Sequence, residues 1–303
     1  MQKHHGRARA RSPILAAIAT LIGSAGLCTN VQAQTSDFTT SSKLLLTGGV
    51  TNIEGSAGGG LTPWAIIGGY GTKDQVGANA FFTNVRSSDY ELRSSGALIG
   101  FQDRVEISFA QQKFDTRQVG GALGLGNGYK FTQNVFGAKV KLVGDAVLEQ
   151  DSWLPQIAVG FQRKENNRGD LLRALGIKSD KGTDYYVSAT KVFLAQSILL
   201  NGTVRFTKAN QTGILGFGTA TRDKYDTVFE GSAALLLRKD LAVGVEFRQK
   251  PDHLPFKEDN WSDVFIAWAP TKNVSVTLAY ANLGNIVIKD KQKGTYLSLQ
   301  VGF

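Results

Sequence analysis

The chain has 303 residues, of which 42% are hydrophobic, and its formal net charge is +9. That hydrophobic fraction, with so modest a net charge, excludes a disordered chain, and 35 glycines without a Gly-X-Y period exclude collagen. The length fits one domain or two, because all-β barrels often exceed the usual domain size.

The first 33 residues have the three parts of a secretory signal peptide. A basic stretch over residues 1–11 precedes an apolar stretch over 14–27, and a small residue, Ala33, follows where a signal peptidase cuts. The apolar stretch is shorter than the ~20 residues that a membrane-spanning helix needs. We expect cleavage after Ala33, with residues 34–303 forming a single outer-membrane β-barrel with long extracellular loops.

Downstream of Ala33, apolar residues follow a period of two. In 105–109, 157–161, 241–248 and 274–280, large apolar side chains alternate with small or polar ones. Alternation places successive side chains on opposite faces of a strand. An apolar outer face with a polar interior is typical of a barrel in lipid, whereas a soluble sandwich buries large residues from both sheets. The pattern predicts an all-β fold, a transmembrane antiparallel up-and-down β-barrel.

The same pattern predicts about 14 strands. The first pair is the weakest, because residues 58–64 are rich in glycine, include Pro63, and fit a loop, a bend or an inserted plug as well as a strand boundary. Without this pair the barrel has 12 strands. In chain order the predicted strands are 43–50, 64–70, 78–84, 95–101, 105–113, 135–143, 156–163, 185–194, 197–207, 228–237, 241–248, 263–269, 274–280 and 295–303.

The connections between these strands alternate in length. Short turns are expected at 102–104, 195–196, 238–240 and 270–273. Long polar segments lie between them, at 113–130, 163–184, 208–227 and 249–262. Short turns on one side and long loops on the other are typical of outer-membrane barrels, with the long loops outside the cell. Within the second long segment, residues 171–176 have helical spacing and end in glycine, which predicts a short helix.

The C-terminal strand carries a second signal. Leu297, Leu299, Val301 and Phe303 share one face, and the last residue is aromatic. This pattern resembles the signal by which bacterial outer-membrane barrels are recognised for assembly. We therefore expect the barrel-assembly machinery and outer-membrane lipid as partners. We also expect external basic residues to contact lipopolysaccharide phosphates.

Charged residues occur at alternating positions opposite large apolar residues in several predicted strands. A cation facing lipid at mid-depth would cost about 2–4 kcal/mol, so these residues should face the lumen. Their simplest role is a mutually neutralised, water-filled wall, and the alternative is a field that selects solutes by charge. The six candidates are Glu106, Lys139, Lys141, Arg205, Glu246 and Arg248.

The sequence offers no catalytic or metal-binding pattern. His253 is the only histidine after Ala33, and the prolines at 251 and 255 predict an extended, solvated loop around it. The single cysteine lies in residues 1–33, so the mature chain has no thiol chemistry. We expect no enzyme, no cofactor and no metal. The basic residues are dispersed and the chain is exported, which also argues against a nucleic-acid partner.

Several segments together resemble one family. They are 43–50, 53–64, 200–210 and Tyr296 to Phe303. The chain resembles a family of uncharacterised proteobacterial outer-membrane proteins, a domain of unknown function, over nearly all of its mature length. The resemblance implies the location and fold, and it transfers no catalytic residue.

These features predict a passive outer-membrane pore for small hydrophilic solutes. Barrels of 8 strands are filled by side chains and those of 16–18 enclose an aqueous channel, so 12 to 14 strands predict a narrow or loop-plugged lumen. The alternative is a structural or adhesive surface protein that acts through its extracellular loops. No residue pattern specifies the solute or the oligomeric state.

Overall fold

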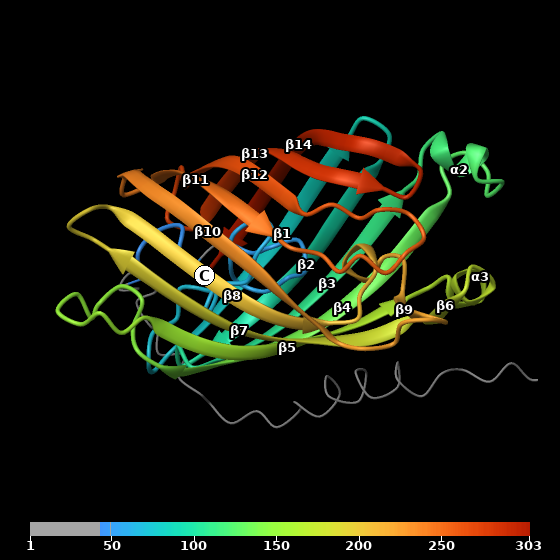
Figure 1. The fold of residues 1–303 in the computed structure, drawn as a ribbon. Helices are drawn as coiled ribbons and strands as arrows, with labels where there is room; N and C mark the ends of the chain where they lie inside the picture. Colours follow the sequence, from blue (N-terminus) through green and yellow to red (C-terminus); the bar gives the residue numbers. More distant parts are fainter. Residues whose placement is uncertain (1–42, 49) are drawn as a thin grey trace, which may run out of the picture. The chain divides into compact units, whose positions relative to one another are not determined.

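Twelve strands form one closed antiparallel barrel in the computed structural model, which describes residues 43–48 and 50–303 (Figure 1). The predicted signal peptide lies outside the described residues. The barrel strands are β1 (Val76–Ser87), β2 (Glu91–Phe101), β3 (Val105–Asp115), β4 (Lys130–Val143), β5 (Gln156–Asn166), β7 (Lys181–Phe193), β8 (Ile198–Thr207), β10 (Asp226–Arg238), β11 (Leu241–Arg248), β12 (Trp261–Trp268), β13 (Val274–Ile286) and β14 (Lys289–Gly302).

The barrel closes between its first and last strands. β1 pairs with β14 from Asn79 opposite Gly302 to Ser87 opposite Gly294. Closure gives each of the twelve barrel strands two neighbours, so the barrel itself has no strand edge with unpaired backbone groups. Across the described part of the chain, no helix is long and apolar enough to span a membrane.

Burial alternates along each barrel strand. In β8, for example, Arg205 is buried while its neighbour Phe206 is exposed. The buried side chains point into the barrel and are mainly polar or small. The outer face carries large apolar residues, among them Phe82, Phe109, Phe136, Val245, Val264, Leu278, Leu297 and Leu299. The apolar-out, polar-in prediction is confirmed.

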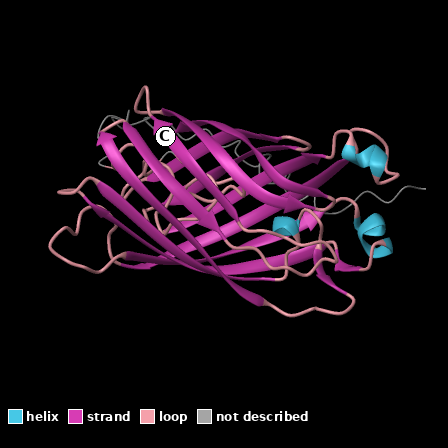
Figure 2. Ribbon diagram, turned by 45° about the horizontal axis from the view of Figure 1, so that its top comes forward, coloured by secondary structure: helices cyan, strands magenta, loops and turns pink. Residues whose placement is uncertain are grey.

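The long connections lie at one end of the barrel. They hold the short helices α2 (Val119–Ala122) and α3 (Gly169–Ala174), the 3-10 turn η1 (Gln211–Gly213), and the two-stranded sheet of β6 (Ile177–Ser179) and β9 (Phe217–Thr219). Figure 2 shows the helices gathered there. The opposite end has short turns, except for residues 144–155 between β4 and β5. Helix α3 overlaps the predicted helix at 171–176.

The two earliest predicted strands, 43–50 and 64–70, are not strands. Residues 50–70 lie inside the barrel and every one of them is buried, so we call them the inner segment (Figure 1). A wall strand would alternate between buried and exposed residues. This segment is covered on all sides, and its glycines and Pro63 disfavour a regular ladder. The barrel therefore has 12 strands, as the shorter of the two predictions states.

Candidate functional site: the inner segment and the charged inner wall

The inner segment folds back on itself within the barrel. The backbone bridges Thr51 to Ala57 and Gly58 to Pro63. At the tip, the Asn52 side-chain oxygen accepts hydrogen bonds from the amides of Glu54 (3.0 Å) and Ser56 (3.2 Å). A short polar side chain that bonds the backbone two residues ahead is how Asn builds a tight turn. This turn fixes Glu54 at the tip.

Glu54 is held by three cations of the barrel wall. Its carboxylate lies 2.5 Å from Lys164 Nζ, 2.8 Å from Arg248 Nη2 and 3.4 Å from Arg205 Nη2. Both Glu54 and Lys164 are fully buried, and the two arginines are nearly so. A buried charge without a partner is strongly destabilising, so the wall and the tip require each other.

Two wall carboxylates complete this tip cluster. Asp184 lies 2.7 Å from Lys164 Nζ, and Glu230 lies 2.5 Å from Arg205 Nε. The wall alone therefore supplies three cations and two anions. Charges within this tip cluster balance only when Glu54 of the inner segment is in place.

A second cluster is built on Glu106 of β3. One carboxylate oxygen accepts from Ser56 Oγ (3.0 Å) and the Ala57 amide (3.1 Å), and the other from the Gly68 amide (2.8 Å). Lys139 of β4 lies 3.0 Å from the same carboxylate. Lys139 also donates to the carbonyl oxygens of Ala57 (3.2 Å) and Trp64 (3.1 Å). This pair therefore binds both arms of the inner segment.

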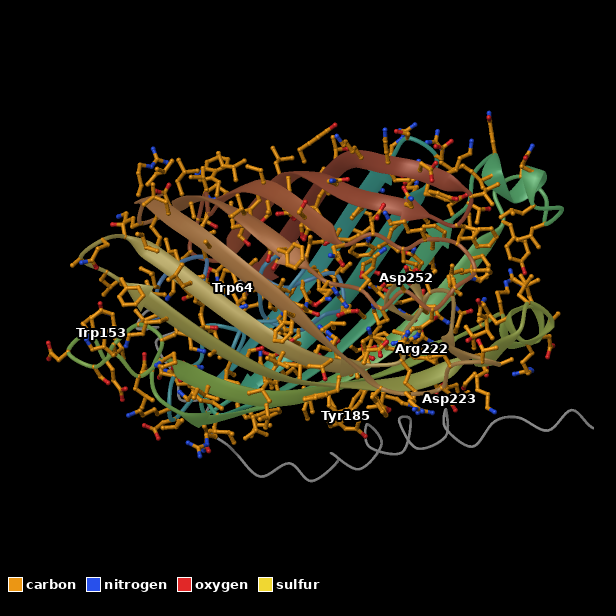
Figure 3. All side chains as sticks on the ribbon, viewed as in Figure 1. Trp64, Trp153, Tyr185, Arg222, Asp223 and Asp252 are labelled. Carbon is orange, nitrogen blue, oxygen red and sulfur yellow. The ribbon has the colours of Figure 1, made fainter. Side chains whose placement is uncertain are left out.

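A third cluster is built on Glu246 of β11. Its carboxylate accepts from the Leu61 amide (2.9 Å) and from Thr62 Oγ1 (2.8 Å). A Cβ on Gly59 would lie 1.9 Å from this carboxylate, so only glycine allows the approach. Ser232 of β10 links Glu246 to the indole nitrogen of Trp64, which donates to Ser232 Oγ at 3.0 Å. In Figure 3 Trp64 lies within the barrel.

An apolar cluster covers the tip towards the long loops. Ile53 and Leu61 of the inner segment pack against a set of apolar side chains and line a pocket with them. These are Leu92, Phe114, Trp261 and Leu283 of the barrel strands, Tyr90 of the turn between β1 and β2, and Ile214 and Leu215 of the connection that holds η1. Tyr90 and Phe114 stack with their ring centroids 5.2 Å apart. The inner wall is therefore charged around the tip and apolar beyond it.

Comparison with known proteins places the chain in a family. The family model described as "Protein of unknown function (DUF3034)" matches residues 47–300. The chain belongs to this family. The resemblance found in the sequence is confirmed. No curated protein matches the chain.

Several solved barrels are similar to this member of the family. The KdgM porin has 10% sequence identity and a TM-score of 0.49, covering 74% of this chain and 99% of its own. Omp33 of Acinetobacter baumannii has 8% identity and a TM-score of 0.46, covering 77% and 100%. Outer membrane phospholipase A from Escherichia coli has 9% identity and a TM-score of 0.41, covering 74% and 92%. The function therefore has to follow from the residues of this chain.

All six charged residues chosen from the sequence are buried inside the barrel. Glu106, Lys139, Arg205, Glu246 and Arg248 contact the inner segment directly. Lys141 is separate from them. It pairs with Asp103 in the turn between β2 and β3, where Lys43 also binds Asp103 at 2.8 Å.

Sequence reasoning missed four members of the tip cluster: Glu54, Lys164, Asp184 and Glu230. Lys164 and Asp184 each lie one residue beyond a predicted strand end, in phase with its inward positions, so slightly longer strands would have included them. Glu230 lies within the predicted strand 228–237 at an inward position. Glu54 had no such signal, because the period of a barrel strand says nothing of a segment inside the barrel.

His253 differs from the expected solvated residue. Its side chain is buried, and Nε2 contacts the carboxylate of Asp226 at the start of β10. Asp226 is also bound by Arg222 at 2.8 Å. The loop folds back on the barrel rim, which covers the imidazole. Over the described residues, no group of three or more His, Cys, Asp or Glu side chains is placed to hold a metal ion.

Proposed function

We propose that this protein is an outer-membrane barrel that passes small solutes, with the inner segment as its gate. The observation that carries the proposal is the match between a charged inner wall and a segment that is not part of the wall. Glu106, Lys139, Glu246 and the tip cluster each bind groups of residues 50–70. A wall that only had to be filled could use apolar side chains.

The nature of the contacts supports a gate. A hydrogen bond to a charged group contributes only about 1.5–3 kcal/mol net, because water replaces the lost partner when the bond opens. Most contacts of the Glu106 and Glu246 clusters are of this kind. The segment can therefore exchange these partners for water as the lumen hydrates, and the same water has to solvate Glu54 and its three cations when the tip is released.

The outer face supports the proposed location. Large apolar residues cover it, and the closed barrel pairs its strand edges, so no unpaired backbone groups of the barrel strands face the lipid. Export by residues 1–33, long loops outside the cell and contact with lipopolysaccharide belong to the same proposal. So does recognition by the barrel-assembly machinery through Leu297, Leu299, Val301 and Phe303, of which the first, second and last are exposed.

Catalysis is not part of the proposal. His253 is the only histidine among residues 34–303, and its Nε2 is already occupied by Asp226. The adhesive alternative depends on the long loops, and no contact of those loops favours it over a pore.

Planar-bilayer recording of refolded residues 34–303 tests the gate. Wild type should give rare, brief openings. Glu106→Gln removes the charge that holds Ser56, Ala57 and Gly68, so it should raise the open fraction several-fold. Glu165→Gln, on the outer face of β5, is the control and should behave as wild type. Absence of conductance in all three proteins would rule out the pore.

A further inference from the structure

The tip of the inner segment presents two adjacent residues to two different environments. Ile53 packs in the apolar cluster, and the next residue, Glu54, lies among Lys164, Arg205 and Arg248. Together they place an apolar group beside a carboxylate. The barrel wall around them is complementary to both parts at once.

The cationic part of this wall is suited to one negative charge. Without Glu54, Lys164 still has Asp184 of the wall as a partner at 2.7 Å, and Arg205 still has Glu230 at 2.5 Å. Arg248 then has only Glu230, at 3.5 Å. One positive charge is therefore uncompensated. Two of the three cations are arginines, whose planar forks suit a carboxylate.

The apolar part lies directly against the cationic part. The ring of Trp261 faces the Arg248 guanidinium, with 6.0 Å between the guanidinium carbon and the ring centroid. Trp261, Tyr90, Phe114 and Leu283 pack in one cluster with Ile53 and line an apolar pocket together with it. A strongly hydrated solute would lose water on this surface without regaining hydrogen bonds, whereas an apolar body would be stabilised there.

We propose that this wall is a recognition site for a small organic monocarboxylate with an apolar body, and that Ile53 and Glu54 occupy it in the closed state. Entry of such a solute through the barrel rests on the proposed function, but binding does not. The solute and the tip compete for the same cations and the same pocket. Binding of the solute therefore favours release of the inner segment.

Chemical rescue tests the cationic part. Glu54→Ala removes the carboxylate and leaves Lys164, Arg205 and Arg248 without their balancing charge, so its refolding yield and thermal midpoint should fall. Millimolar acetate should restore both, because it can occupy the vacated position. Acetamide, which has nearly the same shape and no charge, should not. If the variant does not refold in plain buffer, the refolding yield with acetate against acetamide is itself the readout.

The apolar part is tested in the double variant Ile53→Ala with Glu54→Ala. Hexanoate should rescue it at a concentration about tenfold below that of acetate, because its chain fills the apolar space. Hexanamide should not rescue it. Glu165→Ala removes an exposed carboxylate next to Lys164 in sequence, and it should need no rescue.

Equal effects of acetate and acetamide would overturn the carboxylate site, and equal potency of hexanoate and acetate would overturn the apolar body. Rescue is measured without conductance, so the two proposals fail separately. Intact rescue in a protein that never conducts contradicts the pore alone. A conducting barrel without rescue contradicts the recognition site alone.

Discussion

At the residue scale, the closed state depends on close approaches that few side chains allow. Gly59 lies against the Glu246 carboxylate, which is itself fixed by Leu61, Thr62 and Ser232. Because the carboxylate is held from several sides, it cannot move away from an added methyl group without losing hydrogen bonds. The glycine-rich residues 58–64, which weakened the prediction of a strand, include a glycine that the packing against Glu246 requires.

Gly59→Ala should therefore destabilise the closed barrel. The new Cβ would lie 1.9 Å from Glu246 Oε1, and overpacking of this kind costs typically 1–3 kcal/mol. Denaturant unfolding in detergent measures the loss. Gly202→Ala is the control, because nothing lies within 4 Å of a Cβ there and the residue is on the outer face of β8. Equal stabilities of the two variants would contradict the close approach.

The residues also show how far the sequence reaches. Alternation assigns Arg205, Arg248, Glu106 and Glu246 to the face opposite the large apolar residues, and in the structure these four side chains are buried. It could not predict their partners, because Glu54 and the Ala57 and Gly68 amides come from a segment with no period of its own. The period of the apolar residues does not depend on the charges of the inward residues, so a barrel with two more anions in its inner wall would show the same apolar pattern.

At the element scale, the twelve later predicted strands all overlap barrel strands, and only the first pair fails. In those twelve strands one face is exposed on the outside of the barrel and the other faces the interior. The alternation of apolar and polar residues in the sequence therefore follows the two faces of each strand. Residues 50–70 face the interior on every side. Their sequence is therefore set by individual contacts with the wall, which no periodicity reports.

The loop between β11 and β12 brings a titratable pair onto η1. Lys250 Nζ donates to Gln211 Oε1 at 2.8 Å, and the Gln211 amide donates to Glu258 at 3.1 Å. Burial raises the pKa of Glu258 to about 7 and lowers the pKa of Lys250 to about 8. Burial therefore destabilises the charged form of both groups relative to the neutral form.

Docking of this loop should weaken as the pH rises from 5 to 7. The folded pKa of Glu258 lies above its ordinary value, so its contribution is full below about pH 4.5 and is lost as the pH passes 7. The protection factors of the amides of residues 249–260, which correct hydrogen exchange for its intrinsic pH dependence, should fall over that range. Glu258→Gln should remove the dependence, and Glu149→Gln, an exposed carboxylate in the connection 144–155, should keep it. A slope that persists in Glu258→Gln would assign the effect to another group.

At the scale of the whole molecule, charged and polar side chains line much of the barrel interior, and large apolar side chains cover its outer face. Val264, in the middle of β12, is 63% exposed, and its two neighbours in the strand, Asp263 and Phe265, point inward. Such exposure is costly in water and favourable in lipid. Figure 3 shows Tyr185 of β7 on the outside of another part of the barrel, where it is 51% exposed.

Val264→Arg should therefore destabilise the barrel in lipid vesicles by about 2–4 kcal/mol if the residue lies near the membrane midplane. Leu148→Arg, in the connection outside the strands, should cost little, although Leu148 is 69% exposed. Unfolding of both variants in vesicles measures the difference. Equal costs would mean that the middle of β12 does not face hydrocarbon.

The central claim is that the inner segment closes the barrel, and a reversible tether tests it most directly. A Cβ on Gly55 would lie 3.1 Å from the Ala110 Cβ of β3, which is within reach of an engineered disulfide. Gly55 has a φ of +92°, so a cysteine there strains the backbone, and the reduced double variant, which carries the same strain, is the reference. The one native cysteine, Cys28, is absent from residues 34–303. Gly55→Cys with Ala110→Cys should conduct in planar bilayers only after reduction. Equal conductance of the oxidised and reduced protein would contradict the account.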